Sequence, residues 1–223
     1  MPKHLQRELE KIKKSILTLG AMVEDRVRLA IKSIDGRDAD IADHIVKMDY
    51  EIDEMEVDIE EECLKVLALY QPVAVDLRFL ACVIKINNDL ERIADEAVNI
   101  AYRVKTISKD KDSEFIFDYA NMAEKAETML RLSLDALVKM DTDLAFKVCL
   151  GDDEVDAFVQ HAYEQLKISI SKMPDKTGAF INMFLISRHI ERIADHATNI
   201  AEEVIYLTEG EIVRHGKGLL ESM

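Results

Sequence analysis

Two stretches one hundred residues apart repeat nearly the same sequence of polar and apolar residues. INNDLERIADEAVNIA spans residues 86–101 and ISRHIERIADHATNIA spans residues 186–201, with ten of sixteen positions identical. Each stretch contains a glutamate and an aspartate four positions apart, Glu91 with Asp95 and Glu191 with Asp195. This spacing places both carboxylates on one face of a helix. Two such carboxylates can together bind a cation.

A second set of carboxylate pairs with the same spacing occurs earlier in each half. Asp49 and Asp53 recur 103 positions later as Asp152 and Asp156. The members of such a pair lie about 5–6 Å apart on a helix and repel each other by roughly 0.2–0.5 kcal/mol. If the two helices of each half are antiparallel neighbours, as short connections favour, four carboxylates converge in one groove. An all-oxygen ligand set suits magnesium, manganese, calcium or iron better than zinc or copper.

The simpler interpretation of these residues is a solvated acidic face, because charged runs on helices usually only face water. In a chain with 44 Asp and Glu residues a single pair indicates little. Four pairs at corresponding places in both halves put a binding site on an equal footing with a solvated face. Arg92 and Arg192, three positions before Asp95 and Asp195, are expected to form ordinary surface salt bridges. Five further polar residues could add ligands, but we interpret them as surface residues: Glu24, Glu127, Asn99, Asn199 and His196.

Helices are the elements expected to carry these carboxylates. In the first copy, apolar residues separated by steps of four and three form the seam of a helix bundle. Counted from that seam, Glu91, Asp95 and Asn99 face the opposite side, so an acidic strip is expected on the outside of the helix. The seam consists of Phe79, Val83, Ile86, Leu90, Ile93, Ala97, Ile100 and Val104.

The periodicity predicts an all-α fold of two tandem three-helix bundles related by internal duplication. Asp38 is a suitable N-cap for the second helix, and Ser113 for the fourth. The polar segment KDKDS at 109–113 separates a first domain, 1–108, from a second domain, 113–223. The expected helices span residues 3–34, 38–70, 72–107, 114–140, 141–172 and 176–209.

Composition limits the class of protein. The formal charge of −15 argues against nucleic acid or anionic lipid as main partners. No apolar run approaches the roughly 20 residues of a membrane span, and an amphipathic helix is expected at the start in place of a signal peptide. Cys63, Cys82 and Cys149 show no CxxC spacing and are expected to be reduced packing residues of a cytoplasmic protein.

Signatures of enzymes are missing from the sequence. A ferritin-like di-iron site needs Glu-x-x-His, and none of the six histidines has a glutamate three positions before it. There is no HExxH motif, no Gly-rich phosphate loop and no G-x-S-x-G. A protein that is not an enzyme is therefore expected, with a carboxylate-bridged metalloenzyme and a metal-free helical docking scaffold as alternatives.

The sequence resembles the PhoU family, the accessory regulators of bacterial and archaeal phosphate transport and signalling. The resemblance covers essentially the whole chain. It rests on QPVAVDLR at Gln71–Arg78, on LERIADEAVNIA, on IERIADHATNIA and on the paired Asp-x-x-x-Asp segments.

The resemblance implies a cytoplasmic protein, expected as a homodimer, that contacts no nucleic acid and does not insert into the membrane. Its implied partners are the ATPase of the phosphate ABC transporter and the phosphate sensor histidine kinase, with phosphate uptake and the starvation response restrained when phosphate is plentiful. It further implies a multinuclear metal cluster on the bundle surface, with iron expected and manganese, magnesium and zinc as alternatives. The implied ligands are Asp49, Asp53, Glu91, Asp95, Asp152, Asp156, Glu191 and Asp195.

Two features depart from the family pattern. Ala94 and Ala194 stand where the family usually has glycine, and Glu96 follows Asp95 where the family usually has histidine. The first copy therefore lacks the histidine that the second copy has at His196, and the two sites are expected to differ.

Overall fold

A computed structural model describes residues 3–109 and 115–213 of the chain. Within these residues it contains seven α-helices, one short 3-10 helix and no strand. The elements are α1 (Lys3–Gly36), α2 (Ala39–Lys47), α3 (Tyr50–Tyr70), α4 (Ala74–Ile107), α5 (Ala120–Lys139), α6 (Thr142–Lys172), η1 (Pro174–Lys176) and α7 (Thr177–Glu209).

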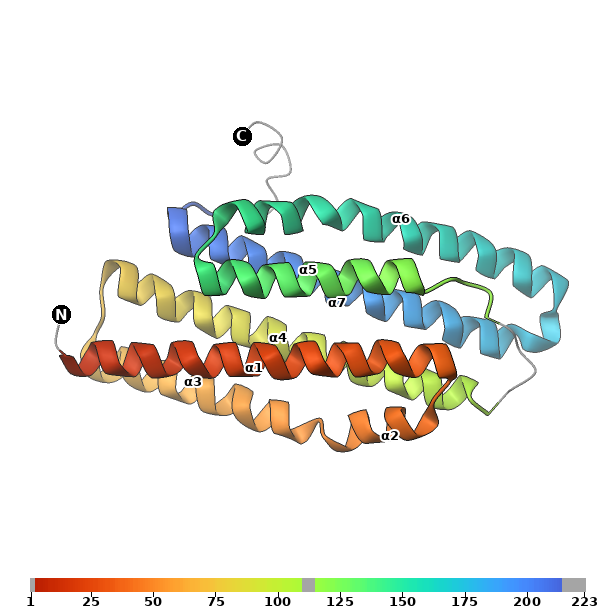
Figure 1. The fold of residues 1–223 in the computed structure, drawn as a ribbon, viewed down its shortest axis with the longest axis horizontal. Coiled ribbons are helices and arrows are strands. Elements are labelled where there is room, and N and C mark those ends of the chain that lie inside the picture. The colour runs from red at the N-terminus through yellow and green to blue at the C-terminus, as the bar shows by residue number, and fades with distance from the viewer. Residues whose placement is uncertain (1–2, 110–114, 214–223) are drawn as a thin grey trace.

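The helices form two bundles that lie against each other (Figure 1). α1, the α2–α3 pair and α4 pack together in the first bundle, and α5, α6 and α7 in the second. The contact between α4 and α7 is the most extensive in the molecule, and α1 also contacts α5. The third helix of each half therefore forms the centre of the interface between the bundles. The prediction of an all-α fold with two tandem three-helix units is confirmed.

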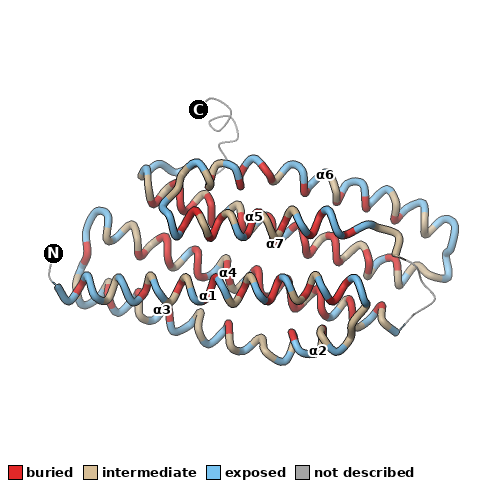
Figure 2. The backbone as a smooth tube through the Cα atoms, in the orientation of Figure 1, coloured by how far each residue is buried: buried red, intermediate tan, exposed pale blue. Residues whose placement is uncertain are grey.

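The predicted seam of α4 faces the core. All of its residues from Val83 to Val104 are buried, and only Phe79 is half-buried. Buried positions recur along the inner side of every long helix (Figure 2). The carboxylate of Asp38 accepts hydrogen bonds at the start of α2, as predicted, and that of Asp141 does so at the start of α6. N-caps of this kind satisfy backbone N–H groups that have no partner within the helix.

The predicted continuous helix over 38–70 is wrong, because the chain breaks at Met48 and Asp49 into α2 and α3. The cause is Arg26, which lies on the buried face of α1 and is 5% exposed. Its guanidinium donates hydrogen bonds to the carbonyl oxygens of Ile45 at 2.9 Å and Met48 at 3.1 Å. A buried arginine needs such acceptors, and the end of α2 provides them.

The second half shows what happens without this arginine. At the same offset of 103 residues, Arg26 corresponds to Met129 and Met48 corresponds to Gly151. A Cβ atom added to Gly151 would lie 3.5 Å from the sulfur of Met129, so the two equivalent positions also meet in this half. Here the contact is apolar and α6 runs without interruption from Thr142 to Lys172.

α5 begins at Ala120, several residues after the predicted start at Glu114, and residues 115–119 are not helical. Tyr119 accounts for the late start. Its buried hydroxyl donates a hydrogen bond of 2.6 Å to the carbonyl oxygen of Met183 in α7. This contact fixes the segment against α7 before the helix begins.

The predicted boundary between the domains falls mostly on residues 110–114, which lie outside the described residues, as does the predicted cap Ser113. The division into 1–108 and 113–223 therefore stays a prediction.

The predicted packing positions of the cysteines agree with the structure. All three thiols are free and buried. Burial raises the pKa of each to about 12, which keeps them protonated and poorly nucleophilic. Over 3–109 and 115–213, no helix combines the length and apolar character needed to cross a membrane.

Candidate metal centre

The carboxylates of the first half gather where α3 begins beside the middle of α4. The break before α3 places Asp49 at its N-terminus with Asp53 one turn later, and α4 supplies Glu91 and Asp95. Burial and the charges of Asp53 and Asp95 raise the pKa of Asp49, while Arg26 opposes the shift. Because residues of α3 and α4 act on one another, the structure brings the four predicted residues of this half together. We call them the first cluster.

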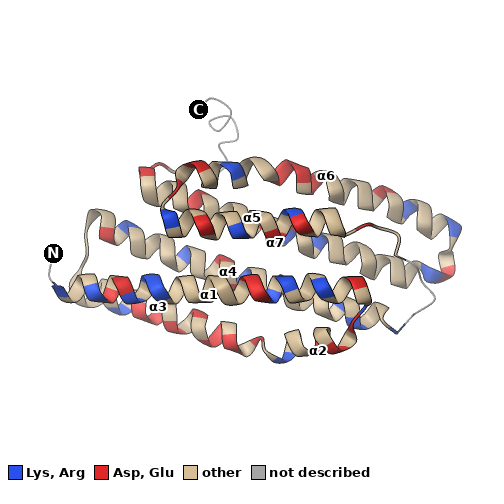
Figure 3. Ribbon diagram, viewed as in Figure 1, with Lys and Arg blue, Asp and Glu red and all other residues tan. Residues whose placement is uncertain are grey.

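The second cluster consists of Asp152 and Asp156 on α6 with Glu191 and Asp195 on α7. Burial, followed by the charge of Asp195, raises the pKa of Glu191, and Asp156 adds to the shift. Burial and the charges of Asp152 and Asp156 raise the pKa of Asp195. The duplicated sequence thus produces a duplicated group of carboxylates between the second and third helices of each half, and Figure 3 shows acidic residues along α3 and α6.

Several oxygen atoms of the clusters fit a cation-binding role. Asp49 Oδ1, Glu91 Oε2 and Glu191 Oε2 are buried and lack a hydrogen-bond partner among the described residues. Buried acceptors without a partner are costly, and a cation would satisfy them. Within residues 3–109 and 115–213, however, no three His, Cys, Asp or Glu side chains are already arranged to hold one ion. The carboxylates would have to rotate toward a metal, and the eight-ligand site stays a prediction.

The predicted outward direction of the acidic strip holds only for the aspartates. Asp95 and Asp195 both reach solvent, although neighbouring side chains cover each enough for partial burial to raise its pKa. Glu191 is only 9% exposed, and Glu91 is also partly covered. The reason is that α3 and α6 pack beside α4 and α7, so a residue opposite the seam of one helix can still be covered by its neighbour.

One of the two predicted arginine salt bridges is wrong. Arg92 does lie 3.7 Å from Asp95, as predicted. Arg192 instead reaches across to α4 and donates to Glu96 at 3.2 Å. Its predicted partner in α7 is bypassed because the bundle interface presents a buried carboxylate within reach.

The interface between α4 and α7 contains two carboxylate–histidine pairs that sequence reasoning did not find. His189 Nδ1 lies 2.6 Å from Glu96 Oε2, and His196 Nδ1 lies 2.8 Å from Asp89 Oδ1. The two pairs are related by the duplication, because Asp89 aligns with His189 and Glu96 with His196 at the offset of 100. The sequence did contain a signal for these pairs. At two aligned positions, one copy of the repeat has a carboxylate and the other copy has a histidine.

Two residues interpreted as surface groups belong to this interface. His196 is mostly covered, and Asn199 donates a hydrogen bond of 3.1 Å to Asp89. The interpretation as plain surface residues is therefore wrong for His196, and Asn199 is not merely solvated. Asn99 is half-buried on α4.

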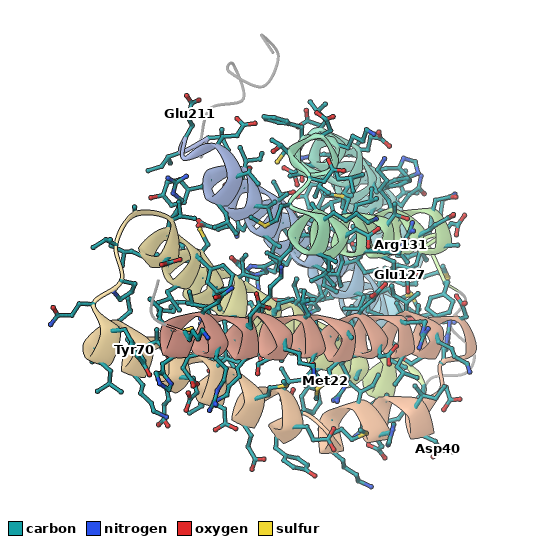
Figure 4. All side chains as sticks on the ribbon, turned by 60° about the vertical axis from the view of Figure 1, so that its left-hand side comes forward. Met22, Asp40, Tyr70, Glu127, Arg131 and Glu211 are labelled. Carbon is teal, nitrogen blue, oxygen red and sulfur yellow. The ribbon has the colours of Figure 1, made fainter. Side chains whose placement is uncertain are left out.

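Glu24 and Glu127 lie away from the clusters, at the contact of α1 with α5. They line a cavity of about 180 Å³ together with Arg28 and Arg131, and Figure 4 shows Glu127 and Arg131 close together on α5. Burial raises the pKa of Glu127; Arg28 opposes this and Glu24 adds to it. A ligand role in the first or second cluster is not supported by this position.

Neutralising one cluster residue is expected to stabilise the metal-free protein. Burial, followed by the charge of Asp95, raises the folded-state pKa of Glu91, and Glu56 and Asp53 contribute. The ionised form is thus penalised in the folded protein, and the penalty disappears as the pH falls through the raised folded-state pKa and then below the unfolded-state pKa. Glu91→Gln should therefore increase the free energy of unfolding by about 1 kcal/mol, from like-charge terms of roughly 0.2–0.5 kcal/mol each.

The measurement is urea unfolding at pH 7 in chelator, with Glu54→Gln as the control. Glu54 is an exposed carboxylate on α3 beside Asp53, and its replacement should change stability by less than about 0.5 kcal/mol. A Glu91→Gln protein less stable than the wild type would show that repulsion does not dominate the first cluster.

Comparisons with known proteins identify relatives of both halves. A family model of the PhoU domain matches residues 16–104 and 119–204. A relative from Clostridium acetobutylicum, named phosphate-specific transport system accessory protein PhoU homolog, is 33% identical, with 95% of this chain and 97% of the relative covered. A relative of the same name from Aquifex aeolicus is 36% identical, with coverage of 95% and 96%.

A solved structure agrees with the fold over nearly the same range. The crystal structure of PhoU from Pseudomonas aeruginosa superposes with a TM-score of 0.89 at 34% identity, covering 92% of this chain and 99% of that one. The two segments matched by the family model correspond to the two bundles of the present structure.

Proposed function

Because the chain belongs to the PhoU family, we propose that it is a negative regulator of phosphate uptake and phosphate-starvation signalling. The observation that carries this proposal is the family match to both bundles, with curated relatives over 95% of the chain named as phosphate-transport accessory proteins. We place the protein in the cytoplasm as a homodimer without catalytic activity. Its partners in this proposal are the ATPase of the phosphate ABC transporter and the phosphate sensor histidine kinase.

The two clusters are the second part of the proposal. Asp49, Asp53, Glu91 and Asp95 would hold metal in the first half, and the four equivalent carboxylates in the second half. The bound metal, expected to be iron with manganese, magnesium or zinc as alternatives, supplies positive charge that offsets carboxylate repulsion. The carboxylates then tie α3 to α4 and α6 to α7. Support comes from the raised pKa values of Asp49, Glu91 and Glu191 and from their buried oxygens, each of which has no hydrogen-bond partner among residues 3–109 and 115–213.

The test compares wild type with a variant carrying Glu91→Gln, Asp95→Asn, Glu191→Gln and Asp195→Asn. In cells that lack their own regulator of this kind, wild type is expected to repress a phosphate-starvation reporter in high phosphate, and the variant to lose most of that repression. Elemental analysis of both proteins, purified without chelator, should find stoichiometric metal only in wild type. Glu54→Gln serves as the matched control and should behave as wild type in both assays.

Different results separate the two parts of the proposal. If wild type contains no metal and the variant still represses the reporter, the clusters are solvated surface and the chain is a metal-free docking scaffold. If wild type does not repress the reporter in high phosphate, the regulatory role itself is wrong.

A further inference from the structure

The two halves differ sharply one helical turn away from the clusters. Glu56 lies one turn after Asp53 on α3, and Asn87 lies one turn before Glu91 on α4. At the offsets of 103 and 100 residues, the equivalent positions of the second half are Val159 and Ser187. The second half therefore has neither the carboxylate nor the amide.

Asn87 is fully buried and only partly satisfied. Its relative exposure is 0%. Its Nδ2 donates to the backbone carbonyl of Glu56 at 2.8 Å and to Glu56 Oε1 at 3.2 Å, so the nitrogen of the amide faces α3. Its Oδ1 has no hydrogen-bond partner in the described part of the chain. A buried amide oxygen without a donor is costly to the fold and is a feature that calls for a ligand.

A second buried oxygen that accepts no hydrogen bond from the described residues lies on the same face of α4. Glu91 is four residues after Asn87, so their side chains are neighbours along the helix. Glu91 Oε2 is likewise buried without a hydrogen-bond partner among the described residues, although Arg92 Nε lies 3.6 Å from it. Glu56 reaches this part of α4 from α3, because its Oε1 accepts a hydrogen bond from Asn87 Nδ2.

The equivalent residues of the second half make different contacts. The hydroxyl of Ser187 donates to the carbonyl oxygen of Phe184 at 2.6 Å, and Val159 is buried against the apolar core. Neither side chain leaves a polar atom without a partner, and neither offers a negative charge. Glu191 therefore lacks the oxygen donors that Glu91 has one turn away.

We propose that the first cluster extends to Glu56 and Asn87 and there holds a hard divalent cation that the second cluster does not hold. The donors are the carboxylates of Glu56 and Glu91 and the amide oxygen of Asn87, a set that suits Mg²⁺ or Mn²⁺. This inference rests on the proposed metal-binding role of the clusters. It assigns two further ligands and makes the two halves unequal in the number of ions that they hold.

The experiment isolates the first half by neutralising the second cluster in a background chain with Asp152→Asn, Asp156→Asn, Glu191→Gln and Asp195→Asn. Mn²⁺ alone is titrated into this chain after removal of other metals, and the free ion is followed by electron paramagnetic resonance. Adding Glu56→Gln is expected to remove one Mn²⁺ per chain from the binding isotherm, or to weaken it at least tenfold. Adding Asn87→Ser, the residue found in the second half, should give the same loss.

Glu56→Gln keeps an acceptor for the amide of Asn87, so the fold should survive, and circular dichroism checks this. Glu54→Gln is the matched control, because it removes an exposed charge from α3 close to the cluster. A converse variant tests gain of the ion: Val159→Glu with Ser187→Asn in an otherwise wild-type chain is expected to add one Mn²⁺.

The outcomes distinguish the inference from the proposed function. In one outcome the background chain binds Mn²⁺, but neither Glu56→Gln nor Asn87→Ser changes the stoichiometry or shifts the affinity more than twofold. The extension of the first cluster is then wrong, while the proposed metal binding stands. If neither wild type nor the background chain binds Mn²⁺ at millimolar concentration, the metal-binding role and the extension fail together.

Discussion

Replacing Arg26 with methionine is expected to lower the free energy of unfolding by about 3 kcal/mol. The guanidinium of Arg26 is buried and donates to two carbonyl oxygens where α2 ends, those of Ile45 and Met48. Hydrogen bonds to a charged group contribute roughly 1.5–3 kcal/mol each, and methionine can replace neither. Urea unfolding followed by helical circular dichroism measures the effect.

The second half supplies a matched partner for this variant. Met129 and Gly151 occupy the equivalent positions there, and α6 is continuous. The double variant Arg26→Met with Met48→Gly reproduces that contact and is expected to recover at least about 1 kcal/mol of the loss, although glycine in a helix itself costs about 1 kcal/mol. Measuring Met48→Gly alone completes the double-mutant cycle, which gives the interaction energy of the two positions.

Two results would contradict this account of the break between α2 and α3. A loss below about 1 kcal/mol in Arg26→Met would mean that the carbonyl oxygens find other donors. Strictly additive effects of the two substitutions would mean that the positions do not act as a unit.

Replacing His189 with leucine is expected to cost about 3 kcal/mol, because it leaves a carboxylate in the bundle interface without its closest partner. Glu96 is 7% exposed, and His189 Nδ1 lies 2.6 Å from it. Burial would raise the pKa of Glu96, but the hydrogen bonds and charges of His189 and Arg192 outweigh it and lower the pKa. The folded protein thus favours the ionised carboxylate, and it depends on these partners.

The double variant His189→Leu with Glu96→Leu is the control for lost charge against lost packing. Two apolar residues can replace a buried hydrogen-bonded pair at little cost, so the double variant should lie within about 1 kcal/mol of wild type. The Glu96→Leu change also removes the salt bridge to Arg192. This costs little stability, because the side chain of Arg192 is largely in solvent. A double variant as unstable as His189→Leu alone would show that the interface needs the shape of these residues and that the charge is secondary.

Much of the fold could be predicted because its signals are local. The four-and-three spacing of α4 fixes which face is buried, and the same spacing recurs in both halves, so an all-α duplicated architecture followed from periodicity. Carboxylates four residues apart necessarily share a helix face, and short connections make the second and third helices neighbours. Those two facts are sufficient to expect each group of four carboxylates between two helices.

Other features depended on residues that meet only after folding. The break between α2 and α3 comes from Arg26, which lies 19 and 22 positions from the carbonyl oxygens that it contacts. The partner of Arg192 is 96 residues away, and that of His189 is 93 residues away. No local pattern distinguishes a buried arginine or histidine from a solvated one, because the choice depends on which acceptor the neighbouring helix presents.

By itself, the sequence determined the all-α class, the duplication and the pairing of carboxylates along each helix, because each follows from spacing along one chain segment. Only the tertiary structure decided that Glu91 and Glu191 are partly or fully covered and that the two halves are joined by carboxylate–histidine pairs. It also decided that Asn87 carries a buried oxygen with no hydrogen-bond partner in the described part of the chain. Burial and pairing are properties of helix contacts, and contacts between helices arise when the bundles pack.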